Sequence, residues 1–142
     1  MKPALPPIDE APAPSDIAFL NEQINAYNFE STGITDGRLL SVFVRDPNGQ
    51  LMAGVYGWTW GGCCEIKYLW VREDQRGQGY GSQLLAAAEG EAIARGCQQI
   101  VLSTHSFQAP RFYQKLGYIA VGVYDDYPKG YQQIFLWKQL KT

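Results

Sequence analysis

The sequence is poor in the residues that build metal centres and disulfide frameworks. Its 142 residues include three cysteines and one histidine. Cys63, Cys64 and Cys97 are odd in number, lack C-x-x-C spacing and lie in apolar stretches, which is typical of reduced, packed thiols. His105 has no Cys or His partner at ligand spacing, so we expect no metal site.

Long apolar runs and clusters of positive charge are also missing. No stretch reaches the ~18–20 apolar residues of a membrane span, and the first residues lack the apolar core of a signal peptide. The net charge is −2, without a Lys/Arg cluster, which argues against a nucleic-acid partner. We therefore expect a cytoplasmic protein that has neither a membrane nor a nucleic acid as its partner.

What the chain does contain is enough apolar residues for one core. The hydrophobic content is 46% over 142 residues, which fits a single domain. Residues 1–14 hold five of the eight prolines, and proline opposes both helix and sheet because it lacks an N–H group. We expect a loose proline-rich arm over 1–14 and a single domain over 15–142.

Hydrophobic periodicity and turn residues predict alternating helices and strands. Ile17 and Leu20 begin a helical stripe that runs to about Asn28, and Ser15 or Asp16 can cap this helix. The later elements are predicted as strands over 39–44, 51–56 and 63–71, a helix over 81–95, a strand over 98–104, a helix over 109–116, and closing strands over 118–124 and 131–140. The strand–helix–strand unit from 63 to 104 favours a parallel strand pair in a mixed α/β fold.

A glycine-rich turn joins the strand that ends at Val71 to the next helix. Gly77, Gly79 and Gly81 lie in this turn. A helix N-terminus presents N–H groups without intrahelical partners, and glycine lets the main chain approach an anion closely. The turn matches neither the P-loop, which ends in GK[ST], nor the G-x-G-x-x-G dinucleotide motif. It predicts a pyrophosphate site of a different kind.

Two motifs resemble those of the GNAT (general N-acetyltransferase) superfamily. Arg76, Gly79 and Gly81, in the pattern R-x-x-G-x-G between a strand and an amphipathic helix, look like its coenzyme-binding motif. The stretch SFQAPRFYQKLGY (106–118) is similar to its later motif N-x-x-A-x-x-FYxKLGF, with Ser106 where the family often has Asn. The resemblance spans residues 15–140. It implies an α/β fold with a mainly antiparallel sheet, a splayed central parallel pair and flanking helices.

The resemblance implies an acetyl-CoA-dependent N-acetyltransferase without a metal, in which a primary amine attacks the thioester directly in a ternary complex. Main-chain N–H groups of the turn would bind the diphosphate, and main-chain groups of the preceding strand would pair with the pantetheine arm, which the residue at the family's Asn position would also contact. The residues implied in coenzyme binding are Leu69, Val71, Arg76, Gly77, Gln78, Gly79, Tyr80, Gly81, Ser82 and Ser106.

Two catalytic residues are implied in the same way. Tyr113 matches the family tyrosine that protonates the departing thiolate, with a core aromatic as the alternative. Glu65 lies where some members carry the base that deprotonates the ammonium, and an ion-paired strand residue is the alternative. Strand alternation predicts Glu65, Lys67 and Leu69 on one face, so Glu65 points to the cleft or pairs with Lys67. His105 is a weaker candidate base.

The acceptor is expected to be a small amine, because aromatics and acids occur in the segments expected to surround it and aromatic faces can hold a cation. These residues are Trp58, Trp60, Tyr68, Trp70, Tyr124, Tyr127, Asp125 and Asp126. A protein N-terminus or a lysine remains a possible acceptor. Two rival functions stay open: a non-catalytic acyl-CoA-binding or sensing domain, and an interaction protein whose glycines only form a turn. An exposed late strand allows a homodimer.

Overall fold

The structure is a computed structural model that describes residues 1–141, and it divides the chain into a unit over Met1–Thr35 and a second unit from Asp36 on. The first unit holds the helix α1 (Pro14–Thr32), which is longer than predicted at both ends. Neither Ser15 nor Asp16 caps it, because the helix begins at Pro14, whose fixed φ suits the first helical position. The domain boundary at residue 15 stays a prediction.

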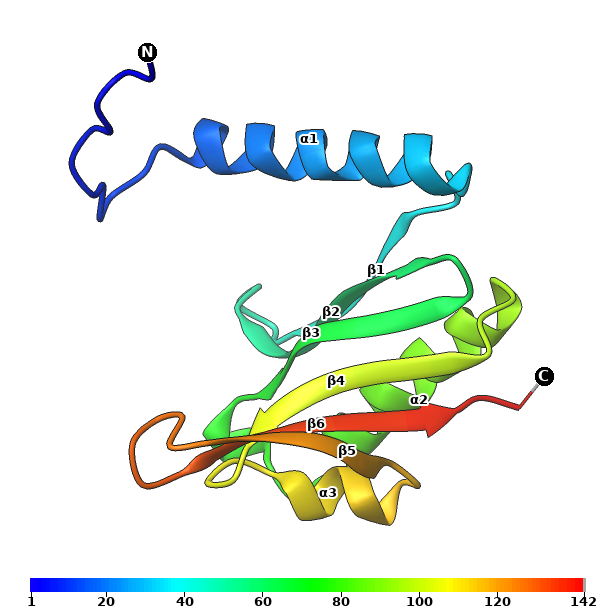
Figure 1. The fold of residues 1–142 in the computed structure, drawn as a ribbon. Coiled ribbons are helices and arrows are strands. Elements are labelled where there is room, and N and C mark those ends of the chain that lie inside the picture. The colour runs from blue at the N-terminus through cyan, green and yellow to red at the C-terminus, as the bar shows by residue number, and fades with distance from the viewer. Residues whose placement is uncertain (142) are drawn as a thin grey trace. The chain divides into compact units, whose positions relative to one another are not determined.

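The second unit is a six-stranded sheet with two helices (Figure 1). Its strands are β1 (Arg38–Arg45), β2 (Leu51–Trp60), β3 (Cys63–Val71), β4 (Gln99–His105), β5 (Ile119–Asp125) and β6 (Gln132–Gln139), in the order β1-β2-β3-β4-β6-β5. A 3₁₀ turn (Glu73–Gln75) and α2 (Tyr80–Ala94) connect β3 to β4, and α3 (Pro110–Lys115) follows β4. All neighbouring strands are antiparallel except β3 and β4. The mixed, mainly antiparallel fold class is confirmed.

The helix α2 covers one face of the sheet and completes its core. Leu84, Leu85, Ala88 and Ala92 recur at helical spacing and are buried, as the sequence predicted. The helix α3 lies on the same face, because Phe112 packs against the position of Gly81 and Tyr113 joins the core cluster. No helix within residues 1–141 is long and apolar enough to cross a bilayer.

The central parallel pair separates after a short contact. β3 and β4 pair only from Cys63 to Glu65 and from Gln99 to Val101, whereas β4 continues to pair with β6 along its whole length. The carboxyl halves of the two strands therefore leave a gap within the sheet. This confirms the splayed parallel pair.

A β-bulge in β3 changes which side chains share a face. Tyr56 pairs with Tyr68 and the next residue, Gly57, pairs with Ile66, so Lys67 is an extra residue without a partner on β2. The alternation beyond Lys67 is therefore inverted, and Leu69 packs on the core while Tyr68 is exposed. The prediction that Glu65, Lys67 and Leu69 share a face was wrong for this reason.

Gly57 permits this bulge. A Cβ atom at Gly57 would collide with the main-chain oxygen of Glu65. Only a residue without a side chain lets the two strands approach so closely at this point. As a result Glu65, Tyr68 and Trp70 lie on the sheet face opposite α2, which we call the open face.

Candidate active site

A cleft of about 1010 Å³ fills the gap between β3 and β4. Its walls come from the second half of β3, the turn before α2, the end of β4 and the segment that leads into α3. The residues that line it are Ile66, Lys67, Tyr68, Leu69, Trp70, Val71, Gln75, Arg76, Gly77, Gly79, Tyr80, Gly81, Ser82, Leu102, Ser103, Thr104, Phe107, Gln108, Ala109, Phe112 and Tyr113. A cleft of this size holds a cofactor-sized molecule.

The glycine-rich turn presents free main-chain N–H groups to this cleft. Gly77 and Gly79 adopt φ of 78° and 89°, which favour glycine, and Gly79 is the N-cap of α2 without a side-chain capping bond. Within residues 1–141, the N–H groups from Gly77 to Ser82 have no hydrogen-bond acceptor. Unpaired N–H groups at a helix N-terminus form a site for an anion such as a diphosphate.

The strand β3 offers main-chain groups to the same cleft. The N–H of Arg72 donates to the carbonyl of Met52 on β2 (2.6 Å). Main-chain groups alternate in direction along a strand, so those of Leu69 and Val71 point away from β2 and into the gap. Nε of Arg76 donates to the carbonyl of Val71 (3.0 Å), which leaves the N–H of Val71 and both main-chain groups of Leu69 able to pair with an extended ligand.

Tyr113 brings a phenol into the cleft from α3. The residue is 8% exposed, and its ring contacts those of Phe112 and Tyr118 edge to face, with centroids 5.1 and 5.8 Å away. Its hydroxyl forms no hydrogen bond with any other described residue. Burial raises the pKa of Tyr113 above its ordinary value, so the phenol keeps its proton at neutral pH. A protonated, unpaired hydroxyl beside the cleft can act as a proton donor.

A partly buried polar cluster is joined to Tyr113 through Tyr118. The hydroxyl of Tyr118 donates to Oε2 of Glu89 (2.8 Å), and Nζ of Lys138 lies 2.8 Å from Oε1 of the same carboxylate. The N–H of Tyr118 also donates to the carbonyl of Tyr113 (3.1 Å). This cluster ties α2, the end of α3 and β6 together. Sequence reasoning missed it, because its members are 29 and 49 residues apart.

Glu65 lies next to the cleft but does not line it. It is the last residue of β3 that pairs with β4, where it lies opposite Val101, and β3 and β4 separate after it. On the other side it lies opposite Trp58 of β2. Its side chain is exposed, and within the described part of the chain it forms no ion pair with Lys67. The carboxylate of Glu65 thus lies unpaired on the open face, at the point where the gap between β3 and β4 begins.

Four other candidates are held by the β5–β6 hairpin. The N–H of Ser106 donates to the carbonyl of Gln132 (2.8 Å), and the Ser106 hydroxyl accepts from the N–H of Gln132 (3.0 Å). Nδ1 of His105 lies 3.0 Å from the carbonyl oxygen of Tyr127. Asp125 accepts from the amide of Gln132, and Asp126 accepts from the N–H of the turn residue four positions later. These side chains form hydrogen bonds that hold the hairpin. Of the candidate carboxylates, Glu65 is the one that forms no such bond with a described residue.

The cleft brings most of the predicted coenzyme-binding residues together. Gln78 and Ser106 are the two that do not line it. Phe107 and Gln108 line it and were not predicted. Oε1 of Gln108 accepts from the N–H of His105 (2.7 Å) and so closes the end of β4. Both residues directly precede the A-x-x-FY motif, and this position could have predicted that they line the site.

The cysteines lie outside the cleft and are free thiols. Burial raises the pKa of Cys64 to about 12 and raises the pKa values of Cys63 and Cys97, which keeps all three protonated. Among residues 1–141, no group of three His, Cys, Asp or Glu side chains is arranged to hold a metal ion.

Comparison with known proteins identifies similar chains. The model of the acetyltransferase (GNAT) family matches residues 8–118. Blasticidin-S acetyltransferase of Streptomyces morookaense is 36% identical over 116 residues, covering 77% of this chain and 83% of the relative. The crystal structure of an acetyltransferase from Bacillus cereus has a TM-score of 0.76 and 36% identity, covering 94% of this chain and 98% of that one.

A more distant structure, from Bacillus anthracis, was solved in complex with acetyl coenzyme A. It has a TM-score of 0.62 and 20% identity, and the match covers 72% of this chain and 63% of that one. At this level of identity the match indicates a shared fold.

Proposed function

This chain belongs to the GNAT acetyltransferase family and is an acetyltransferase, and from that premise we propose that it transfers the acetyl group of acetyl-CoA to the primary amine of a small molecule. The observation that carries the proposal is the cleft within the splayed sheet, which has free N–H groups at one wall and the phenol of Tyr113 at another. A relative named for acetylating blasticidin-S supports a small-molecule acceptor.

The coenzyme would bind through main-chain groups. The N–H groups from Gly77 to Ser82 hold the diphosphate, since they have no other acceptor and face the cleft. The pantetheine arm extends along β3 and pairs with the main chain of Leu69. The N–H near Leu69 then polarises the thioester carbonyl, in the manner of an oxyanion hole. Val71 contributes less than predicted, because Arg76 already bonds its carbonyl.

The acceptor approaches from the open face. Its ammonium has a pKa near 10.4, so a base must remove a proton before nitrogen can attack. Glu65 takes this proton. The nitrogen forms a bond to the thioester carbon, the C–S bond breaks, and Tyr113 donates its proton to the leaving thiolate. The nitrogen then gives up its surplus proton, which returns to the Tyr113 phenolate, and Glu65 releases its proton to solvent. Both residues are restored, and one proton is released overall.

The direct test is release of coenzyme A from acetyl-CoA with a panel of small amines, followed with a disulfide reagent. We expect thiol release that depends on the amine. The variant Glu65→Gln should lower kcat/KM at pH 7 by ~100-fold or more, in the range of general base catalysis, with a smaller loss for amines that are already deprotonated. A variant with wild-type kcat/KM across the pH range would exclude Glu65 as the base. Binding of coenzyme A without turnover of any amine would refute the transferase reaction.

A further inference from the structure

Three aromatic rings surround the mouth of the cleft on the open face. Tyr68 and Trp70 come from β3, and Phe107 comes from the segment after β4, so the rings lie on the two sides of the gap. They are 63%, 48% and 55% exposed. Exposed rings gathered at a cleft are typical of a binding site, because water contact is costly for them. We call these three residues the aromatic mouth.

Two rings of the aromatic mouth, Tyr68 and Phe107, are held in position by neighbouring rings before any ligand binds. Tyr68 stacks on Tyr56 of β2 with centroids 6.3 Å apart and planes at 23°. Phe107 stacks on His105 at 5.4 Å and 10°, and meets Tyr131 edge to face at 5.1 Å. The bond between His105 and the carbonyl of Tyr127 fixes this wall to the hairpin. Rigid rings bind a flat ligand at a lower entropic cost than mobile ones.

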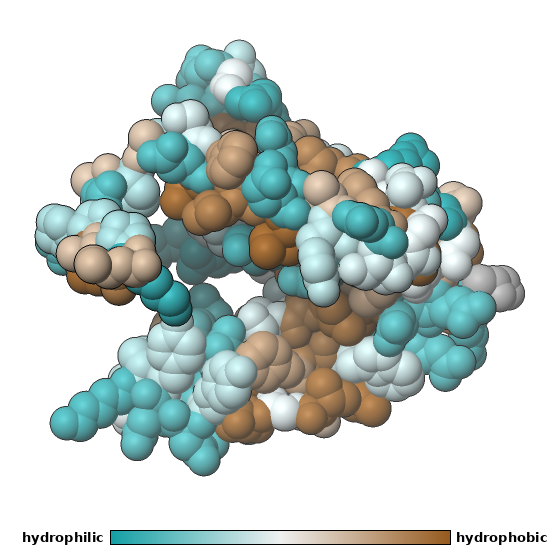
Figure 2. Space-filling model, turned by 45° about the horizontal axis from the view of Figure 1, so that its top comes forward, coloured by the Kyte–Doolittle hydropathy of each residue, from teal (hydrophilic) through white to brown (hydrophobic). Residues whose placement is uncertain are grey.

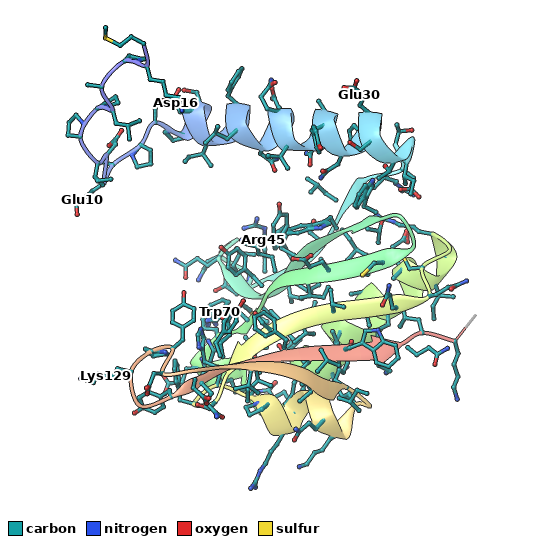
Figure 3. The ribbon with its side chains drawn as sticks, in the orientation of Figure 1. Glu10, Asp16, Glu30, Arg45, Trp70 and Lys129 are labelled. Carbon is teal, nitrogen blue, oxygen red and sulfur yellow. The ribbon has the colours of Figure 1, made fainter. Side chains whose placement is uncertain are left out.

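One residue of the mouth, Trp70, is labelled in the figures. Figure 3 shows Trp70 at the end of the sheet that also carries the β5–β6 turn with Lys129. Figure 2 shows brown hydrophobic side chains exposed between teal polar ones on the face viewed there. The mouth thus opens at the carboxyl ends of β3 and β4, where the two strands are separated.

Charge near the mouth suits a ring that carries an ammonium group. Nζ of Lys67 lies 5.8 Å from the centroid of the Tyr68 ring, so a cation already occupies that ring face, and the group that attracts the ammonium of a ligand is the carboxylate of Glu65. Glu65 lies on the same face as Tyr68, and their partners on β2, Trp58 and Tyr56, are two residues apart. At ~3.3 Å per residue Glu65 and Tyr68 are therefore about 7 Å apart along the strand. The carboxylates of Asp125 and Asp126 are engaged in the hairpin.

We propose that the acceptor is a primary amine that carries a flat aromatic or heteroaromatic ring, with the ring packed against the aromatic mouth and the nitrogen near Glu65. This inference depends on the proposed transferase function and names its substrate class. A ring against Tyr68 and an amine joined to it by two or three carbons span most of the distance of about 7 Å to Glu65, and the Glu65 side chain can reach over the rest. Stacking acts on the bound substrate and on the transition state alike, so it lowers KM more than it raises kcat.

The test compares 2-phenylethylamine with 2-cyclohexylethylamine, which differ in the flatness of the ring. The readout is the ratio of their kcat/KM values in the wild type divided by the same ratio in a variant, which cancels the difference between the pKa values of the two amines. The variants Trp70→Leu and Phe107→Leu remove a flat face and keep apolar bulk. Phe19→Leu, at an exposed ring on α1 that does not line the cleft, is the matched control.

We expect the ratio to fall about 3- to 10-fold in both cleft variants, mainly through KM, and to stay unchanged in the control. Thermal unfolding and coenzyme A binding check that each variant is folded, and Phe107→Leu decides the matter if Trp70→Leu does not fold. Turnover of both amines with an unchanged ratio would overturn the inference and leave the transferase function intact. Absence of thiol release with both of these amines in the wild type, when another amine of the panel is turned over, would also overturn the inference and leave the transferase function intact. Absence of thiol release with every amine of the panel would count against the transferase function itself.

Discussion

Replacing Tyr113 with Phe removes one oxygen atom from the cleft and keeps the ring contacts with Phe112 and Tyr118. The lost hydroxyl forms no hydrogen bond within residues 1–141, so the stability should change by no more than about 0.5 kcal/mol. General acid catalysis contributes roughly 10²- to 10⁴-fold. We therefore expect kcat to fall at least ~100-fold, which corresponds to about 2.7 kcal/mol of transition-state stabilisation.

The assay is thiol release at saturating acetyl-CoA, with kcat and KM measured separately from pH 6 to pH 10.5. Since burial raises the pKa of Tyr113, the phenol stays protonated up to its ordinary value of ~10, and the wild-type rate should fall only above that pH. This alkaline decline should be absent in the variant. KM for acetyl-CoA should stay within about threefold, because the main chain holds the coenzyme.

Tyr124→Phe is the matched control, because Tyr124 is exposed on β5 and does not line the cleft. It should keep wild-type kcat. The reasoning would be refuted if Tyr113→Phe bound coenzyme A normally and turned over at the wild-type rate. A joint loss of stability and coenzyme binding would instead mean that the hydroxyl serves the fold.

Three further substitutions test the turn, the bulge and the buried cluster. Gly79→Ala should destabilise the protein by about 1 kcal/mol and raise KM for acetyl-CoA, because φ is 89° there; Gly49→Ala, with φ of 82° in the β1–β2 turn, should cost similar stability in urea unfolding without a change in KM. Gly57→Ala should cost about 2 kcal/mol or more, because its Cβ would collide with the main-chain oxygen of the facing strand, and a higher melting temperature for this variant would contradict the bulge. Its control is Gly90→Ala, in open space within α2, which should stabilise the protein by about 0.5–1 kcal/mol. Tyr118→Phe should cost about 1–2 kcal/mol, because the partly buried carboxylate of Glu89 loses one of its two donors and keeps only Lys138. Burial and that carboxylate raise the pKa of Tyr118 in the folded state, so the stability it contributes is present below pH ~10 and declines as the pH rises above it; equal stability of variant and wild type at pH 7 would refute this role.

Local patterns in the sequence were sufficient for the elements and for the glycine-rich turn before α2. The stripe from Leu84 to Ala92 predicted α2, and the glycines after Val71 predicted the turn with free N–H groups. These features depend on residues close together in the chain, so periodicity and turn chemistry reveal them. The two motifs around Arg76 and Tyr113 then indicated the family.

The acceptor half could not be predicted, because it depends on pairing between distant segments. The bulge at Lys67 exists because Gly57 lets β2 approach β3, and it inverts the faces of every residue after it. The engagement of Asp125 and Asp126 in the hairpin likewise appears only when the hairpin forms.

The sequence by itself determined the order of helices and strands, the amphipathic core and a turn suited to a diphosphate. Only the tertiary structure decided that Tyr68 and Trp70 share a face with Glu65 and that Phe107 stands across the gap from them. The physical reason is that strand register, unlike helical periodicity, is fixed by contacts between residues far apart in the chain, and a shift of one residue exchanges the two faces of a sheet.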